Sequence, residues 1–556
     1  MGVLTSILRP ARTLVILSTL AGVVSGVSGV ALIALVQEAT GGGQPANPAR
    51  LAAMFAGLCL LAASTRLLAQ SATIRLAHGA SSALAIRVCR GVLQLPLERF
   101  EAIDHAKLLA VLTEDIGVVA NTLAGFPLAT LNMAIVVVCL GYIGWMAPAV
   151  LFSGALFAVV AGATHRLTSS HAVDQLRAAR TRQDSLVGHY RTLIGGFREL
   201  KQHGPRRDAF LADALIAESL AVRDRMVGGL TSFALAATWG QLAYFGFIGF
   251  VVFGLPRFVA IDGSSLSGLV LALLYLFVPL DVLVNWGSNI ARARASLGRI
   301  DALMPTLDAG REDLAGPKAE PLAFAASLRL DGVGYAYRAG AGHEGFALGP
   351  VDLMIGKGEV VFIAGGNGSG KTTLMKLIAG LYKPDSGQIT LDGRAIGADD
   401  LEAYRQLFSV IFADGHLFRE VRGVASDDLL ERSGELLARL GLEGVVRFDG
   451  SAFSTVDLSQ GQKRRLALLT ACLEARPICL FDEWAANQDP SFKRIFYREV
   501  LPELRAAGKT LVVISHDDEY LGVADRVVRL RDGRIVEDSL AARDSFDLAL
   551  ETSQSL

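Results

Sequence analysis

The chain has 556 residues, too many for one ordinary domain, and its 53 Lys and Arg residues nearly balance its 54 Asp and Glu residues. That balance gives no reason to expect a nucleic-acid surface, so we predict no nucleic-acid partner. Hydrophobic residues make up 52% of the chain and charged residues only 19%, which indicates that part of it lies in a lipid bilayer.

Six apolar segments in the first half are each close to the roughly 20 residues that a helix needs to cross a bilayer. They cover residues 13–36, 51–72, 118–146, 148–164, 227–256 and 266–286. The third and fourth nearly abut, which predicts a tight helical hairpin. Because a spanning segment must satisfy its own backbone amides, we predict an all-α membrane domain of six spans over residues 1–304.

Lys and Arg residues gather before the first span and in two long loops, 73–117 and 165–225, whereas the other connections hold few. By the positive-inside rule, both termini and both long loops face the cytoplasm. The loops have helical periodicity, so we expect the spanning helices to run on into the cytoplasm. The alternative for them is a peripheral amphipathic helix on the lipid surface.

Polar side chains inside the apolar segments are candidates for a cargo cavity, because a membrane interior rarely tolerates them without a function. These candidates are Arg66, Asn121, Asn132, Gln241, Asp281 and Asn285. Asp281 and Asn285 share one helix face, and Arg66 could face the cavity or pair with Asp281. The alternative role for these groups is to join neighbouring helices.

Residues 305–321 are rich in Pro, Gly and charge, and we interpret them as a linker. From 322 to 540, glycine-punctuated strands alternate with helices, which is typical of an α/β domain. Residues 541–556 then form a C-terminal tail.

The segment VVFIAGGNGSGKTT, residues 360–373, has the pattern of a strand, a phosphate-binding loop and a helix start. Glycines let backbone N–H groups approach phosphates, Lys371 neutralises the β- and γ-phosphates, and the Thr372 hydroxyl can bind Mg²⁺. The residues expected to hold ATP here are Gly365, Asn367, Gly368, Ser369, Gly370, Lys371, Thr372 and Thr373.

Two carboxylates, Asp482 and Glu483, end the apolar run ICLF. Beside a phosphate-binding loop, Asp482 can hold the metal and Glu483 can polarise the attacking water. A second apolar strand, LVVIS, ends in His516, which could touch the γ-phosphate and the water. The alternatives are acids at a strand end that reaches solvent, and a structural histidine.

The segment DLSQGQ, residues 457–462, starts a helix with Ser459 and Gly461 at its N-terminus, a second place suited to an anion. One chain cannot obviously bring this loop and Lys371 to the same phosphate, but a second copy of the chain can. We therefore predict a homodimer.

In order, the 365–373 loop, LSQGQ (458–462), ICLFDE (478–483), NQD (487–489) and His516 resemble the motifs of ATP-binding cassette (ABC) transporters. Six spans with two long cytoplasmic loops resemble the exporter type, so the resemblance covers residues 1–540. It implies an ATPase with Mg²⁺ as cofactor, catalysis by Glu483 and His516, and nucleotide contacts from Ser459, Gly461 and Gln462 across a dimer. It also implies that Tyr337 stacks on adenine; the alternative is a core strand tyrosine.

A narrower resemblance lies in the segment around FDEWAANQDP and SHDDEY, which is similar to the cyclic-peptide exporter branch; Trp484 is part of it. It implies export of a cyclic peptide, a peptide siderophore precursor or a lipopeptide across the inner membrane of a bacterium. Two departures stand out: Gln460 replaces the first glycine of L-S-G-G-Q, and Ala413 or Asp414 stands where a glutamine is usual. We expect Asp414 to take over the metal contact.

Other functions remain open at this point. A lipid flippase or a multidrug exporter is the main alternative. An ATP-gated membrane sensor is disfavoured by the intact Glu483 and His516, and an importer by the absence of an attached receptor.

Overall fold

The computed structural model describes residues 12–40, 47–259, 263–309, 311–312, 322–337, 345–423, 429–486 and 488–541. The chain divides into two compact units. The first comprises Met1–Ile86 and Ala110–Ala302, and the second comprises Arg87–Leu109 and Leu303–Leu556. The tip of the first long loop thus groups with the nucleotide domain, and most of the expected linker and tail lies outside the described residues.

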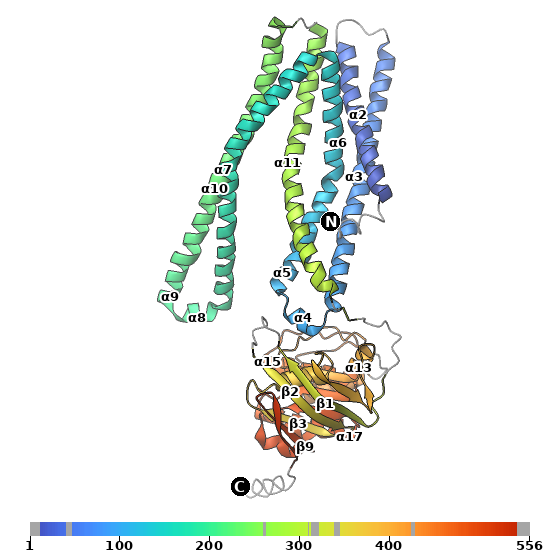
Figure 1. Cartoon of the computed structure of the whole chain (residues 1–556), viewed down its shortest axis with the longest axis vertical. Helices are drawn as coiled ribbons and strands as arrows, with labels where there is room; N and C mark the ends of the chain where they lie inside the picture. Colours follow the sequence, from blue (N-terminus) through green and yellow to red (C-terminus); the bar gives the residue numbers. More distant parts are fainter. Residues whose placement is uncertain are drawn as a thin grey trace. The chain divides into compact units, whose positions relative to one another are not determined.

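The first unit is built from helices alone (Figure 1). Its long helices are α2 (Arg12–Thr40), α3 (Pro48–Leu93), α6 (Ile116–Met146), α7 (Pro148–Gly195), α10 (Ala217–Gly249) and α11 (Gly263–Asp308). Short helices and turns complete it: η2 (Val111–Asp115), α8 (Phe197–Gln202), α9 (Gly204–Ala209), η3 (Phe210–Ile216), η4 (Phe250–Gly254) and η5 (Leu255–Arg257).

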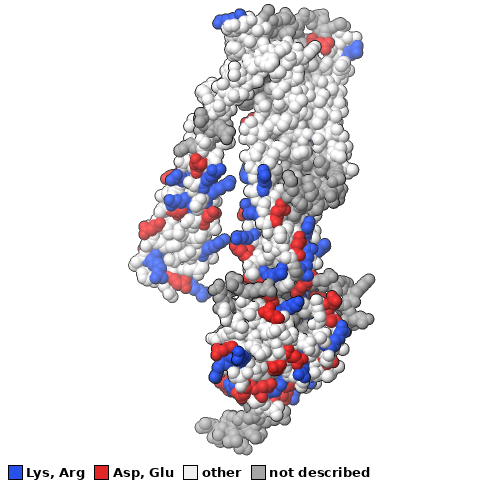
Figure 2. Space-filling view, in the orientation of Figure 1, with Lys and Arg blue, Asp and Glu red and all other residues white. Residues whose placement is uncertain are grey.

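All six predicted spans are helical. Five described helices are long and apolar enough to cross a membrane, and the sixth segment, Pro148–Thr164, is a shorter apolar stretch at the start of α7. The predicted hairpin is present: α6 ends at Met146, Ala147 is extended, and Pro148 begins α7. Figure 2 shows a broad uncharged zone over these helices, with charged side chains gathered along one part of α7 and α10.

Helix α7 continues far beyond its apolar part, to Gly195, and packs along α10. This confirms the expectation that the spans run on as helices into the second long loop. The packed interior of the unit joins α2, α6, α10 and α11, and its most buried side chains include Cys139, Val251 and Leu269. In addition, Arg299 of α11 donates from Nε to Asp115 Oδ2 at 2.9 Å, so that the buried Asp115 carboxylate is paired.

The second unit holds two sheets. An antiparallel sheet has the order β2-β1-β4-β5, formed by β1 (Ser327–Ala336), β2 (Ala347–Gly356), β4 (Ser386–Leu391) and β5 (Arg394–Ala395). A six-stranded sheet has the order β10-β9-β3-β8-β7-β6, formed by β3 (Val360–Gly365), β6 (Phe408–Ile411), β7 (Ile478–Asp482), β8 (Thr510–Ile514), β9 (Arg526–Arg531) and β10 (Arg534–Leu540).

Helices complete the second unit. They are α4 (Leu97–Glu101) and α5 (His105–Ala110) from the first long loop, then α12 (Lys371–Ile378), α13 (Leu401–Arg405), α14 (Leu429–Arg439), α15 (Gln460–Glu474), α16 (Pro490–Ile495), η6 (Phe496–Val500), α17 (Leu501–Ala506) and η7 (Asp518–Val523). Together with the first unit, this confirms the predicted fold class, a helical membrane bundle fused to an α/β nucleotide-binding domain.

Strands β3, β6, β7 and β8 run parallel, with β8 between β3 and β7. All five residues of β7 and of β8 are buried, which explains their continuous apolar sequence. Because the carboxyl ends of parallel strands meet at one edge, the segments that follow β3, β6, β7 and β8 converge there. The predicted nucleotide residues stand at this edge.

Candidate nucleotide-hydrolysis site

The loop between β3 and α12 forms a cradle for phosphates. Gly370, just before α12, has φ of +102°, and a Cβ atom there would come within 2.9 Å of Phe346, so only glycine fits. Lys371 is only 6% exposed, and its Nζ donates to the carbonyl oxygens of Gly365 and Gly366 at 3.0 Å each. The lysine is therefore folded back over the loop, with its charge placed where phosphates would lie.

Two buried polar atoms in this cradle, Ser369 Oγ and Asp482 Oδ1, have no hydrogen-bond partner within the described part of the chain. Buried polar groups are normally paired, so an orphaned hydroxyl and an orphaned carboxylate oxygen point to a ligand. The other carboxylate oxygen, Asp482 Oδ2, accepts from Thr372 Oγ1 at 3.1 Å. A hydroxyl and a carboxylate, completed by nucleotide phosphates, are a donor set that suits Mg²⁺.

The pKa shifts of Asp482 and Lys371 agree with a site that holds Mg²⁺ and phosphates. Burial raises the pKa of Asp482, and the nearby charges of Glu483 and Asp414 act in the same direction, while the Thr372 hydrogen bond opposes them. Burial lowers the pKa of Lys371, against the charges of Glu483 and Asp482. Each group is thus held in surroundings that disfavour its charge, and a cation beside Asp482 with phosphate anions beside Lys371 would relieve both.

Glu483 and His516 are brought together, although 33 residues separate them. His516 Nε2 lies 3.0 Å from Glu483 Oε1, and Lys371 Nζ lies 4.0 Å from the same oxygen. The two side chains are 32% and 42% exposed, so water can reach them. The Glu483 carboxylate lies between the imidazole of His516 and the amino group of Lys371, so it is placed to accept a proton from water.

The other residues of the predicted phosphate loop also lie at this end of the sheet. Asn367 and Gly368 form the exposed tip of the loop, and Thr373 is buried in the first turn of α12. The Tyr337 hydroxyl is 3.0 Å from Thr373 Oγ1, and its ring lies between those of Tyr335 and Phe346. Asp414 lies exposed in the turn after β6, close enough for its charge to affect Asp482.

The Ser459 loop occupies a separate position in the chain. Ser459 caps α15: its Oγ accepts from Gln462 N at 3.3 Å, and its own N donates to Gln462 Oε1 at 3.0 Å. The Ser459 side chain bonds to nothing else among the described residues, and it is exposed. Gly461 and Gln462 are half-buried beside it. The Ser459 side chain thus stands exposed at the start of α15.

The cargo candidates do not form one cluster in the single chain. Arg66, Gln241, Asp281 and Asn285 are exposed, and no ion pair joins Arg66 to Asp281 within the described ranges. Asn132 is buried instead and donates from Nδ2 to the Leu128 carbonyl at 2.6 Å, which is a helix-internal role.

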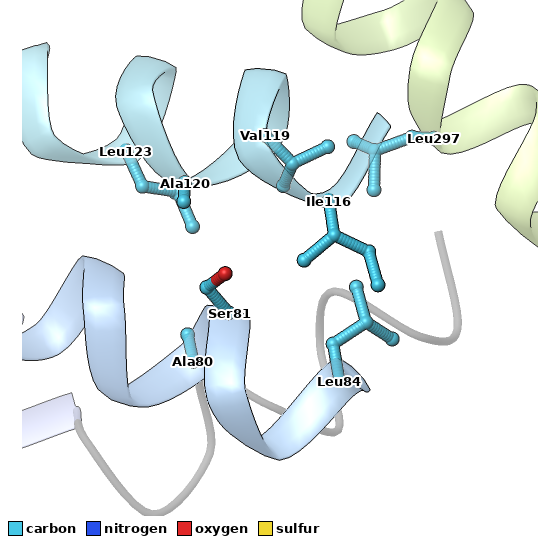
Figure 3. A pocket seen from close by; sticks show the side chains of 8 residues that line it. All are labelled: Ala80, Ser81, Leu84, Ile116, Val119, Ala120, Leu123 and Leu297. Carbon is cyan, nitrogen blue, oxygen red and sulfur yellow. The ribbon is translucent and has the colours of Figure 1, made fainter. Parts of the chain in front are cut away.

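A small cavity of about 10 Å³ opens between α3, α6 and α11, and Figure 3 shows its eight lining side chains. All are apolar except Ser81, and none is a cargo candidate. It has room for about one water molecule, so it is not a cargo site.

The sequence did not single out Lys376, Tyr382 and Lys383 as the residues of the nucleotide domain that meet the first long loop. Glu101 of α4 pairs with Lys376 Nζ at 2.8 Å and accepts from the Tyr382 hydroxyl, while Glu98 accepts from Lys383 N at 3.2 Å. Burial raises the pKa of Tyr382, and the hydrogen bond to Glu101 adds to this. An acidic α4 and a basic stretch near residue 376 are the only sequence signal, and it is weak.

Comparison with known proteins agrees with this geometry. Residues 348–486 match the family described as "ABC transporter". ATP-binding protein SyrD of Pseudomonas syringae pv. syringae is 36% identical over 467 residues, which cover 82% of this chain and 82% of SyrD. A solved structure of a bacterial Atm1-family ABC exporter with ATP bound superposes with a TM-score of 0.70, at 20% identity and over 99% of both chains, which shows a shared fold.

Two further relatives match in part. Mycobactin import ATP-binding/permease protein IrtB of Mycolicibacterium thermoresistibile is 32% identical over 337 residues, 56% of this chain and 53% of that one. Probable syringafactin export ATP-binding/permease protein SyfD of Pseudomonas syringae pv. syringae (strain B728a) is 34% identical over 230 residues, 38% of this chain and 34% of that one.

The fold and the site are those of a membrane exporter powered by a fused nucleotide-binding domain. The chain belongs to the ABC transporter family: it is a half-transporter of the exporter type that binds ATP and couples its hydrolysis to transport.

Proposed function

We propose that two copies of this chain form an exporter for a peptide, either a cyclic peptide, a peptide siderophore precursor or a lipopeptide. The observation that carries the transport mechanism is the joining, in one chain, of the Lys371, Glu483 and His516 arrangement to six apolar helical segments. The cargo class is supported by the branch resemblance around Trp484 and by the similarity to a relative named a probable syringafactin exporter.

In each nucleotide site, Lys371 and the backbone of the 365–373 loop would hold the phosphates of ATP, and Tyr337 the adenine. Thr372 and Asp482 would hold Mg²⁺, with Asp414 nearby, and the bound ion would supply positive charge against the negative charge that develops on the phosphate oxygens. Glu483 would accept the proton of the attacking water, and His516 would fix the direction of its carboxylate. Residues 459–462 of the second copy would complete the site from the opposite side.

A homodimer is supported by the position of the Ser459 loop. Ser459 serves as a helix cap, and among the described residues its side chain bonds only to Gln462. The loop keeps an exposed hydroxyl and the free end of a 15-residue helix, both suited to an anion. A second copy placed head to tail brings this end to the Lys371 loop.

Coupling between ATP hydrolysis and transport would pass through the first long loop. The Tyr337 hydroxyl meets Thr373 next to the phosphate loop, the Tyr337 and Tyr382 rings lie 6.2 Å apart, and the Tyr382 hydroxyl donates to Glu101 of α4. Nucleotide binding at Tyr337 would thereby act on α4.

The cargo and its direction are tested by comparing cells of the source organism with and without this protein, and with Glu483→Gln in its place. If the protein exports a peptide, a peptide product accumulates inside both deficient strains and disappears from the medium. Accumulation in the medium alone would indicate uptake, the direction given in the name of IrtB. An unchanged peptide profile, with altered membrane lipids or altered drug resistance, would favour a flippase or a multidrug exporter instead.

A further inference from the structure

The turn after β7 places Glu483 in an unusual backbone conformation. Glu483 has φ of +48°, in the left-handed region that residues other than glycine rarely occupy. The front of the turn is held by the sheet, where Glu483 N donates to the Ile514 carbonyl of β8 at 3.1 Å. The catalytic carboxylate therefore depends on whatever holds the rest of this turn.

Part of that support is the turn's own Ala486 N, which donates to the Glu483 carbonyl at 3.1 Å, and the side-chain support comes from one arginine of α15. Arg464 Nη1 donates to the carbonyl oxygens of Glu483 at 3.0 Å, of Trp484 at 3.4 Å, and of Ala486. The three carbonyls converge on one charged donor, and hydrogen bonds to charged groups are stronger than neutral ones. The guanidinium thus holds together the three backbone carbonyls of the turn.

Trp484 returns the contact. Its indole Nε1 donates to the Arg464 carbonyl at 2.7 Å, and its ring stacks on Phe496 with centroids 4.3 Å apart. Trp484 is 2% exposed and Phe496 is fully buried, so the indole is held in place by its hydrogen bond and by its stacking. The pair is reciprocal: each residue donates to the other's backbone, which fixes α15 and the turn together.

A third contact joins the same two segments at the start of α15. Gln488 Nε2, beyond the turn, donates to the Gly461 carbonyl at 3.1 Å, and Gln488 is 8% exposed. Gly461 is one turn from Arg464 and belongs to the Ser459 loop. The helix that carries this loop is thus anchored at two levels to the segment that carries Glu483.

We infer that Arg464 and Trp484 are positioning residues for the ATPase: they hold Glu483 in its left-handed conformation and direct its carboxylate toward His516 and Lys371. Because Arg464 belongs to α15, a movement of α15 acts directly on ATP hydrolysis. A ligand that displaces the Ser459 end of α15 changes the position of the Glu483 backbone in the same chain, without passing through the nucleotide bound there.

The test uses the full-length protein in lipid nanodiscs and compares Arg464→Met, Arg464→Lys and Trp484→Phe. Met removes the donors but keeps length, and Phe keeps the stacking on Phe496 but removes the indole N–H. Since misplacing a catalytic group by about 1 Å costs on the order of 100-fold, we expect kcat for ATP to fall about 10- to 100-fold in Arg464→Met, with KM within about twofold. Arg464→Lys should restore part of this loss, and Trp484→Phe should show a smaller loss of the same kind.

The matched control is Arg439→Met on α14, which removes an arginine paired with Glu503 at 2.8 Å but unconnected to the turn; its kcat should stay near wild type. In a Glu483→Gln background, Arg464→Met should leave the affinity for ATP unchanged. A loss in Arg464→Met no larger than in Arg439→Met would overturn the inference, as would a rise in KM with constant kcat. If Arg464→Met does not yield folded protein, Trp484→Phe decides: unchanged kcat there refutes the positioning role.

Discussion

Replacing Glu101 by Ala should uncouple ATP hydrolysis from transport. The Glu101 carboxylate is the shared partner of Lys376 Nζ and the Tyr382 hydroxyl. Tyr382 is 2% exposed, so losing Glu101 leaves its buried O–H donor without that acceptor, at a cost of about 1–3 kcal/mol, while the hydroxyl oxygen still accepts from Lys376 Nζ at 3.2 Å. The pair with Lys376 adds about 0.2–1 kcal/mol, because Glu101 is 40% exposed.

A loss of about 1–3 kcal/mol corresponds to an approximately 5- to 150-fold shift in the equilibrium between docked and undocked α4. The nucleotide residues are untouched, so basal ATPase activity should stay near wild type while cargo transport per ATP falls. Reconstituted vesicles in which both rates are measured provide the assay, with hydrogen exchange over residues 97–109 as a direct measure of docking.

A double-mutant cycle identifies the cause. If the effect runs through the tyrosine hydroxyl, Glu101→Ala in a Tyr382→Phe background should cost about 1 kcal/mol less in docking than in the wild type. The matched control is Glu402→Ala, whose side chain bonds, among the described residues, only to Gln406 at the end of the same short helix. Additive effects of Glu101 and Tyr382, or equal losses of ATPase and transport, would refute the proposed role of this contact.

Four further outcomes are expected. Glu483→Gln should abolish steady-state phosphate release while ATP binding persists, because water polarisation is lost and the phosphate contacts remain; near-normal turnover would show that Glu483 is only a strand-end acid. Asp482→Asn should remove the Mg²⁺ dependence of ATP binding, measured by titration with and without the ion, and an unchanged dependence would place the metal elsewhere. Mixing Lys371→Ala chains with Ser459→Arg chains should restore part of the ATP-dependent dimer closure, because some sites then lack both lesions; no recovery in the mixture would contradict composite sites. Arg66→Ala should lower peptide-stimulated ATPase more than basal ATPase, whereas equal loss would indicate a structural role.

The positions of the candidate nucleotide residues in the fold could be predicted from the sequence because several of them follow the ends of parallel strands. An apolar run followed by Asp482 and Glu483, and another followed by His516, place these side chains at one sheet edge whatever the intervening helices do. The approach of His516 Nε2 to Glu483 Oε1 follows from the adjacent positions of β7 and β8. The six apolar segments could also be predicted, because the thickness of the bilayer fixes the length of a spanning helix.

Contacts between side chains that are far apart in the sequence could not be predicted in this way. Arg464 lies on a helix with no strong apolar stripe, and nothing in its spacing indicates that it reaches three carbonyls around residue 484. The polar groups in the spans show the same limit: Asn132 and Arg66 both stand in apolar segments, yet one is a buried helix-internal donor and the other is exposed. Helical periodicity locates such residues on a face but does not determine which neighbour covers it.

Two sets of contacts hold Glu483, one at its carboxylate and one at its backbone. Its carboxylate contacts His516, and its backbone is held by Arg464 of α15. The same helix begins at Ser459, which in the proposed dimer contacts the ATP of the other site. Each catalytic glutamate would then respond to the nucleotide in both sites, through His516 to its own and through α15 to the other. Alternation between the sites would follow from the fold of one chain, with no further element required.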